Sequence, residues 1–160
     1  MKPAVFCIPP DLLRQRVTKM SEPINFHFDV DGENFSSAGE ASVIVKKQLR
    51  QLGISPDIIR RVSIAMYEGE INMVIHAQGG TADVTVFDSE IVITLADKGP
   101  GIPDINLAMQ EGYSTARENI RSLGFGAGMG LPNMKKYTDS MEIQTELGVG
   151  TTITMKVSLQ

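Results

Sequence analysis

The sequence predicts an α+β fold, a two-layer α/β sandwich in which helices cover one face of a mixed, mainly antiparallel sheet of about five strands. Segments rich in valine, isoleucine and threonine occur as neighbouring pairs, as antiparallel strands do. Helical apolar periodicity precedes and separates these pairs, which favours one helical layer over alternating parallel units. With 160 residues, 42% of them apolar, the chain can form one hydrophobic core.

The first expected elements are a strand and a helix. Residues 24–30 alternate apolar and polar side chains, which predicts a strand with one side facing solvent. A helix is expected after Ser36 or Ser37, and Gly53 is a suitable stop for it. Its apolar positions recur at spacings of three and four: Ala41, Val45, Leu49 and Leu52.

A longer helix is expected next. Ser55 stands at the N-cap position and Pro56 at the first helical position, a combination typical of helix starts. The apolar-periodic run that follows reaches about Ala77. Gly79 and Gly80 are expected to end this helix.

The rest of the chain predicts two strand pairs around a glycine-dense region. Residues 82–87 and 90–96 read as strands joined by a tight turn at Asp88 and Ser89. The later elements expected are a short helix near 104–111, a helix at about 129–138, and strands at 140–146 and 151–159 around a turn at 148–150.

Composition excludes several classes of function. The net charge of −4 offers no basic field for a phosphate backbone, so direct binding of nucleic acid is not expected. Cys7 is the only cysteine and His27 and His76 are the only histidines, too few for a disulfide or a structural zinc site. No run approaches the ~20 apolar residues of a membrane span. We therefore expect a cytoplasmic protein with no membrane partner.

Prolines divide the beginning of the chain from the rest. Pro3, Pro9, Pro10 and Pro23 interrupt residues 1–23, which we interpret as an N-terminal appendage with no assigned role. Residues 24–160 contain no repeat, low-complexity tract or linker and are expected to form the single domain.

Three groups of residues carry candidate chemistry. The first is Glu68, Asn72 and His76, spaced four apart and therefore on one side of the long helix. A carboxylate, an amide and an imidazole on one edge can form a site, although many helices expose such residues to water. Because Glu70 points off this face, it is expected to serve as an internal control for Glu68.

The second group is Asp97-Lys98-Gly99-Pro100-Gly101-Ile102, at the end of a predicted strand. A carboxylate there can accept a hydrogen bond from an exocyclic amine, and glycines allow a flat ring to approach the backbone. A plain turn would need the same residues.

The third group, Gly124 to Leu131, has four glycines in seven residues and leads into a helix. Backbone amides and the helix N-terminus would favour a phosphate, and a flexible hinge is the alternative. Gly148 to Thr152 is a weaker motif that could be only a hairpin. The polar stretch 112–122 fits a mobile lid with side chains able to meet phosphate: Ser114, Thr115, Arg117 and Arg121.

Together and in this order, the motifs resemble the GHKL ATP-binding superfamily, the Bergerat fold, over about residues 24–157. Glu68 to Asn72 resembles the Asn box, Asp97 to Ile102 the first glycine box, and Gly126 to Leu131 the second. Gly150-Thr151-Thr152 resembles the motif on the last strand. ATP and Mg²⁺ are the cofactors implied.

The resemblance also implies roles for single residues. Asn72 would ligate Mg²⁺, Asp97 would accept from the adenine amino group, and Thr152 would support Asp97 through a shared water. The other nucleotide-binding positions implied are Gly99, Gly101, Ile102, Gly126, Gly128, Gly130 and Leu131.

Within the superfamily, the chain looks most like the switch-protein serine kinases and anti-sigma factors, especially the stressosome-associated kinase, through 112–115 and 130–132. In that branch a glutamate four residues before the asparagine acts as base, the place of Glu68. The resemblance implies phosphorylation of serine or threonine on a STAS-type antagonist protein, with a sigma factor, a phosphatase or a second copy as further partners. An ATP-gated binding module without turnover and a stand-alone ATPase are the alternatives. Glu68→Ala is expected to abolish phosphotransfer, whereas Glu70→Ala is expected to retain most of it.

Overall fold

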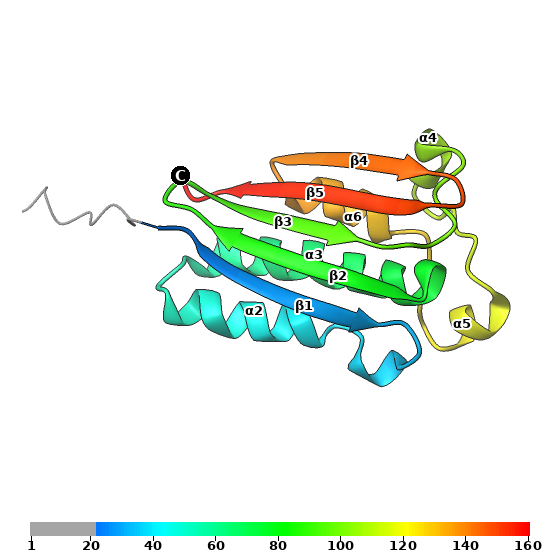
Figure 1. Cartoon of the computed structure of the whole chain (residues 1–160), viewed down its shortest axis with the longest axis horizontal. Helices are drawn as coiled ribbons and strands as arrows, with labels where there is room; N and C mark the ends of the chain where they lie inside the picture. The colour runs from blue at the N-terminus through cyan, green and yellow to red at the C-terminus, as the bar shows by residue number, and fades with distance from the viewer. Residues whose placement is uncertain (1–21) are drawn as a thin grey trace, which may run out of the picture.

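The computed structural model describes residues 22–160, and nearly all of the predicted appendage, residues 1–21, lies outside the described part. The elements in chain order are β1 (Ile24–Asp31), η2 (Phe35–Ser37), α2 (Glu40–Gln51), α3 (Pro56–Ala77), β2 (Gly79–Val86), β3 (Glu90–Ala96), α4 (Ile105–Ala108), α5 (Glu118–Ser122), α6 (Gly130–Tyr137), β4 (Ser140–Glu146) and β5 (Gly150–Ser158). Figure 1 shows one sheet with the helices behind it.

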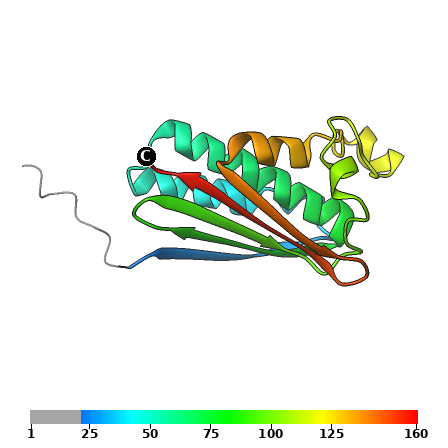
Figure 2. The same ribbon diagram turned by 90° about the horizontal axis from the view of Figure 1, so that it is seen from above.

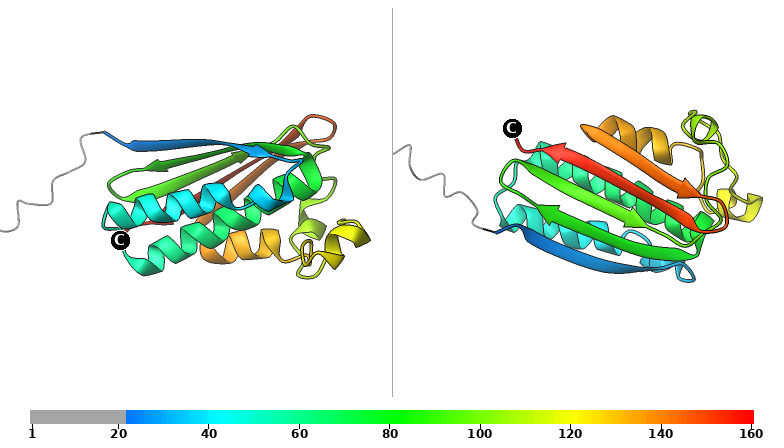
Figure 3. Two further views of the ribbon diagram at one scale, coloured as in Figure 1. Left: turned by 90° about the horizontal axis from the view of Figure 1, so that it is seen from below. Right: turned by 45° about the horizontal axis from the view of Figure 1, so that its top comes forward.

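The described strands form one five-stranded sheet in the order β1-β2-β3-β5-β4. All four strand pairs are antiparallel, so the expected fold class is confirmed and the expectation of a mixed sheet becomes a purely antiparallel one. Seen from above, α2, α3 and α6 lie on the same side of the sheet (Figure 2). Figure 3 shows α2 and α6 on either side of α3, and both of them contact α3.

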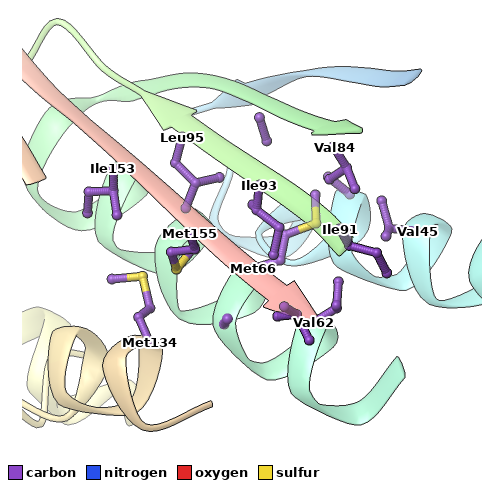
Figure 4. Packing of buried hydrophobic residues seen from close by; sticks show 14 of the residues in the cluster. Val45, Val62, Met66, Val84, Ile91, Ile93, Leu95, Met134, Ile153 and Met155 are labelled. Carbon is purple, nitrogen blue, oxygen red and sulfur yellow. The ribbon is translucent and has the colours of Figure 1, made fainter. Parts of the chain in front are cut away.

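Alternation along the strands creates the face on which the helices pack. In β3, for example, Ile91, Ile93 and Leu95 are buried while the residues between them are partly exposed. Figure 4 shows the apolar side chains of β3 and β5 against those of α3 and α6, with Ile93 and Met155 between the layers. Burial of these side chains supplies the driving force for joining the layers.

A missing side chain lets α3 approach the sheet closely. Gly69 lies over β3, and a Cβ atom at this position would be 1.9 Å from Leu95 Cδ1. A side chain at residue 69 would therefore displace the Leu95 side chain from its place in the core. Since Glu68 and Asn72 flank this position, the close approach sets where both project.

Two element boundaries differ from the predicted ones for backbone reasons, and one short helix was not predicted. Helix α2 begins at Glu40, later than expected, because Gly39 has a φ of 93° and is not helical. Gly79 and Gly80 belong to β2, and the left-handed residue that ends α3 is Gln78, with a φ of 58°. The helix that was not predicted is α5, which lies in the stretch 112–122 that we interpret as a lid.

Candidate functional site

A pocket of about 500 Å³ opens at the end of the sandwich where β3 runs out. Its walls come from the C-terminal half of α3, the segment after β3, the loop that precedes α6, and the start of β5. Figure 1 shows α4 and α5 gathered at this end of the molecule. Segments far apart in the chain therefore meet around one cavity, and the cavity size is suitable for a small-molecule ligand.

Most of the predicted site residues line this pocket. The structure brings nine of them to its wall: Glu68, Asn72, Asp97, Gly101, Ile102, Gly126, Gly128, Gly130 and Leu131. Gly99 and Thr152 are not among the lining residues.

Asp97 lies at the end of β3 with one carboxylate oxygen fixed by the backbone. Its Oδ1 accepts hydrogen bonds from the N–H of Gly99 at 2.8 Å and of Thr151 at 3.2 Å. Its own N–H donates to the Thr151 carbonyl at 2.9 Å. Within residues 22–160 the structure records no hydrogen bond to Oδ2, so this oxygen is available to an amine in the pocket.

Thr151, and not the predicted Thr152, is the threonine on the pocket side of β5. Thr151 is buried with Ile153 on the inward face of the strand, whereas Thr152 pairs with Ala96 and faces outward. The reason is the period of two along a strand. The apolar residues of β5, Ile153, Met155 and Val157, already mark the inward parity in the sequence, and this was the signal that could have identified Thr151.

Thr151 is joined to a second threonine that sequence analysis missed. The hydroxyls of Thr145 and Thr151 lie 2.9 Å apart, and the Ile102 N–H donates to Thr145 Oγ1 at 2.8 Å. These bonds connect β4, β5 and the segment after β3 at the pocket wall. Thr145 therefore fixes the backbone beside Ile102, a role that spacing along the chain does not reveal.

Gly99 supports the pocket from behind. A Cβ atom there would be 2.6 Å from Ala77 Cβ, so a side chain would collide with the end of α3. With its N–H bound to Asp97, Gly99 shapes the turn that presents this carboxylate. Gly99, predicted as a nucleotide-binding position, is thus next to the pocket through Asp97 but is not one of the residues that line it.

The predicted edge of α3 faces the pocket with all three of its polar residues. Glu68 Oε1 accepts a hydrogen bond of 2.7 Å from Asn133 Nδ2 on α6. Asn72 lies against the first residue of α6, since a Cβ atom on Gly130 would be 2.9 Å from Asn72 Oδ1. His76, the third member of this group, also lines the pocket, and its Nδ1 lies 3.5 Å from Thr115 Oγ1. Burial lowers the pKa of His76, against a smaller opposing effect of Asp97.

Glu70 points away from the pocket, as helical geometry predicts, but it is not a neutral control. Its side chain is 1% exposed and accepts from the N–H groups of Gly39 at 2.9 Å, Ala41 at 3.3 Å and Ser42 at 2.6 Å. Burial raises the pKa of Glu70, and the backbone hydrogen bonds oppose this rise. Because no side chain caps α2 at Gly39, Glu70 performs this task from the neighbouring helix.

The glycine-rich loop packs tightly on the candidate lid. The Gly112 N–H donates to the Gly128 carbonyl at 3.0 Å and closes the loop at its base. A Cβ atom on Gly128 would be 2.5 Å from the Gly112 backbone, and one on Gly126 would be 2.4 Å from Ala116. Gly126 has a φ of 72° and Gly128 a φ of 78°, so the backbone conformation also favours glycine at both positions.

The lid arginines that we expected to meet phosphate do not line the pocket. Arg121 instead donates from Nη2 to the Ser114 carbonyl at 2.8 Å and so stabilises the lid. Among the described lining residues none is lysine or arginine, whereas Glu68, Asp97 and Asp104 bring carboxylates. The favourable charge for an anion comes from the N-terminus of α6, whose N-cap residue makes no side-chain cap.

This donor set fits a nucleotide with a hard cation better than a resident metal cluster. Residues 22–160 contain no group of three or more histidine, cysteine, aspartate or glutamate side chains able to hold a metal ion. The Asn72 amide has no recorded hydrogen bond within the described chain, and one oxygen donor with phosphates and waters is an ordinary Mg²⁺ environment.

The fold and the pocket define an ATPase-type nucleotide-binding domain, and the family comparison agrees. The chain belongs to the histidine kinase-, DNA gyrase B- and HSP90-like ATPase family, whose model matches residues 57–160. A GHKL domain is therefore established, with the ATP binding that characterises the family.

More specific likeness is to proteins named anti-sigma F factor. The chain is 31% identical over 140 residues to the one from Bacillus licheniformis, covering 84% of this chain and 90% of the relative. It is 29% identical over 143 residues to that of Geobacillus stearothermophilus, covering 86% and 92%. The switch-protein branch inferred from the motifs is thereby supported.

A solved structure of low identity agrees with the fold. The RsbU and RsbW domains of a Mycobacterium tuberculosis protein superpose with a TM-score of 0.58 at 16% identity, over 84% of this chain and 32% of that one. In the described part of the chain, every helix is too short or too polar to cross a bilayer.

Proposed function

We propose that this protein is an ATP-dependent serine/threonine kinase that phosphorylates a STAS-type antagonist protein and thereby regulates a sigma factor in the cytoplasm. One observation carries the proposal: a single pocket joins the free Asp97 oxygen, the Asn72 amide, the Glu68 carboxylate and the N-terminus of α6. These groups suit the two ends of ATP and the transfer of its terminal phosphoryl group.

The adenine end of the pocket is assigned to Asp97 and its neighbours. Asp97 Oδ2 would accept from the exocyclic amine, because Oδ1 is already bound by two backbone N–H groups. Gly101 and Ile102 would contact the flat faces of the ring. Thr151 would take the supporting role first expected of Thr152, since its side chain shares the pocket wall.

The phosphate end is assigned to Asn72 and α6. Gly130 opens α6 beside Asn72, so backbone N–H groups and the positive end of the helix dipole would meet the phosphates there. Mg²⁺, held by Asn72 Oδ1, would neutralise phosphate charge in a pocket whose described lining lacks lysine and arginine. Gly126 and Gly128 would hold the loop around the phosphates while packed on the lid.

Glu68 is the proposed catalytic base. A serine hydroxyl is a weak nucleophile, and a carboxylate within hydrogen-bond reach can accept its proton as the phosphoryl group moves. Glu68 lines the pocket one helical turn before Asn72, on the same face of α3. Its position beside the proposed Mg²⁺ ligand fits attack at the terminal phosphate.

The relatives support the regulatory side of the proposal. Four relatives named anti-sigma F factor match over most of their own length, because the alignments cover between 80% and 94% of each relative. A sigma factor and a phosphatase are therefore proposed as further partners, and the homodimer left open by the resemblance stays a prediction. ATP-gated binding without turnover is the second candidate function, favoured by the same anti-sigma names.

Label transfer separates these candidates. The purified protein is incubated with γ-labelled ATP, Mg²⁺ and a STAS-domain protein from the same organism, and label on serine or threonine of that protein is the expected result. A stable complex without label would support the binding module, and phosphate release without an acceptor would support a stand-alone ATPase.

A pair of glutamate variants tests the base in the same assay. Glu68→Ala is expected to reduce the transfer rate by at least 100-fold, the size typical of a lost general base. Glu33→Ala is the matched control, because Glu33 is exposed on the loop after β1 and does not line the pocket. Equal rates for the two variants would refute the assignment of Glu68.

A further inference from the structure

We propose that Asn133 is a positioning residue, which orients the Glu68 carboxylate and links it to the glycine-rich loop. This inference rests on the proposed function, because it takes Glu68 to be the base. Asn133 lies outside every motif identified in the sequence.

The contact has an unambiguous direction. Asn133 Nδ2 lies 2.7 Å from Glu68 Oε1, and this is the hydrogen bond that the structure records for the Glu68 side chain within residues 22–160. An ionised carboxylate can only accept, so the amide must present its NH₂ group to it. Oε1 is thereby occupied, and Oε2 is left for another donor.

Helix α6 fits onto both α3 site residues at once. Gly130 lies against Asn72, and Asn133, one turn later, binds Glu68, which is one turn before Asn72. Both contacts can form together because the two residues on each helix are separated by about one helical turn. A displacement of α6 that changed the first contact would therefore also change the second.

The far part of α6 is anchored on the core and on α3. Met134, next to Asn133, is fully buried, and Arg61 of α3 donates from Nε to the Tyr137 carbonyl at 3.1 Å. The part of α6 that carries Asn133 is therefore fixed on the core, whereas Gly130 at the start of the helix is next to the proposed phosphate site. This arrangement makes α6 a rigid link between the phosphate end of the pocket and Glu68.

A fixed Glu68 would speed the chemical step without tightening ATP binding. In that step the substrate oxygen bonds to the γ-phosphorus, the bond from γ-phosphorus to the bridging oxygen breaks with its electron pair leaving on ADP, and the hydroxyl proton passes to Glu68 Oε2. Asn133 contributes by holding Oε1, so that one rotamer of Glu68 is populated when the hydroxyl arrives.

The test separates orientation from mere packing through two different readouts. In Asn133→Leu, which removes the NH₂ donor at similar size, the rate of label transfer to the STAS protein at saturating ATP should fall about tenfold or more. The Kd for a fluorescent ATP analogue with Mg²⁺ should stay within about twofold, because Asn133 is not a lining residue. Asn133→Gln, which keeps the amide, should recover part of the rate.

Asn25→Leu is the matched control. Asn25 also makes one side-chain hydrogen bond, accepting from Thr85 at 2.8 Å, but lies on the exposed side of β1 far from the pocket in sequence and sheet order. It should leave the transfer rate unchanged. An Asn133→Leu rate within twofold of wild type would overturn the inference alone, as would equal losses of rate and ATP affinity that Asn133→Gln does not repair. Failure of the wild type to label the acceptor would overturn the proposed function and this inference with it.

Discussion

Helix α3 carries two glutamates that lie two residues apart and face different surroundings. Glu70 points toward the start of α2, is almost fully buried and accepts three backbone N–H groups. Glu68 points into the pocket, is only partly buried and accepts from a single side-chain amide. The same side chain is thus committed to the fold on one face of α3 and left open to chemistry on the other, and only its surroundings make the difference.

The largest effect expected is the loss of stability on removing Glu70. Glu70→Ala would leave the N–H groups of Gly39, Ala41 and Ser42 unpaired in a buried place, which costs about 3 kcal/mol or more. Urea unfolding of Glu70→Ala and of Glu68→Ala, compared with wild type, measures this cost directly. Glu68→Ala should lose only about 1 kcal/mol, since it removes one hydrogen bond at a partly exposed site.

Glu70→Gln sharpens the same contrast. Glutamine keeps one acceptor oxygen but turns an NH₂ group toward a backbone donor, so its stability should fall between those of wild type and Glu70→Ala. If Glu68→Ala unfolds as easily as Glu70→Ala, the distinction between the two faces of α3 is wrong. The original expectation for Glu70→Ala therefore needs a measurement of folded protein before any activity is compared.

Substitutions on the pocket face of α3 should change the affinity for ATP more than the free energy of unfolding. Asn72→Ala is expected to weaken binding of ATP in Mg²⁺ by tenfold or more, at least about 1.4 kcal/mol, because the described lining supplies no lysine or arginine in its place. Titration calorimetry with Mg²⁺ and with EDTA measures the effect. Wild type without Mg²⁺ should resemble Asn72→Ala, and an ATP affinity that is indifferent to Mg²⁺ in wild type would contradict the assignment.

Much of the fold and part of the site follow from periodicity. The strands near 90–96 and 140–146 and the helix from Pro56 to Ala77 were predicted with nearly the observed bounds, because apolar spacing sets them directly. The same periodicity predicted that Glu68 and Asn72 share one face of α3, since a spacing of four defines one helical face, and both line the pocket.

The failures share a different physical cause. The role of Glu70, the bond between Asn133 and Glu68, and the link between Thr145 and Thr151 all join residues from separate elements. Such contacts depend on how close two elements approach, and a single sequence does not encode that distance locally. The structure of the lid was the most difficult to predict from the sequence. Its glycines allow the backbones of residues 112 and 128 to pack closely, and they follow no periodic pattern.

Gly130→Ala is expected to have a smaller effect, in which the stability of the free protein and its affinity for ATP change differently. Gly130 is the first residue of α6, where alanine gains less over glycine than the about 1 kcal/mol of a helix interior, so the free protein should be about as stable as wild type. The new methyl group would lie 2.9 Å from Asn72 Oδ1 and displace that flexible amide, so Mg²⁺-dependent ATP affinity should fall severalfold. Thermal unfolding with and without Mg²⁺-ATP checks both signs, and an unchanged ATP-induced shift in Tm would contradict the contact between Gly130 and Asn72.

The smallest effects expected come from the two histidines, His27 on the open face of the sheet and His76 on α3 at the pocket. On the open face, the hydrogen bond with Asp83, with smaller help from Asp29, raises the pKa of His27 above 6.5. Its stabilising contribution is present below about pH 6.5 and is lost as the pH rises through the folded-state pKa. At the pocket, burial lowers the pKa of His76 despite the nearby Asp97, so stability is lost as the pH falls below about 6.5. Relative to wild type, His27→Gln should therefore be more damaging at about pH 5.5 than at about pH 7.5, and His76→Gln more damaging at the higher pH. Urea midpoints at both pH values measure the differences, and opposite signs are required because burial disfavours a charge at position 76 while a carboxylate favours one at position 27.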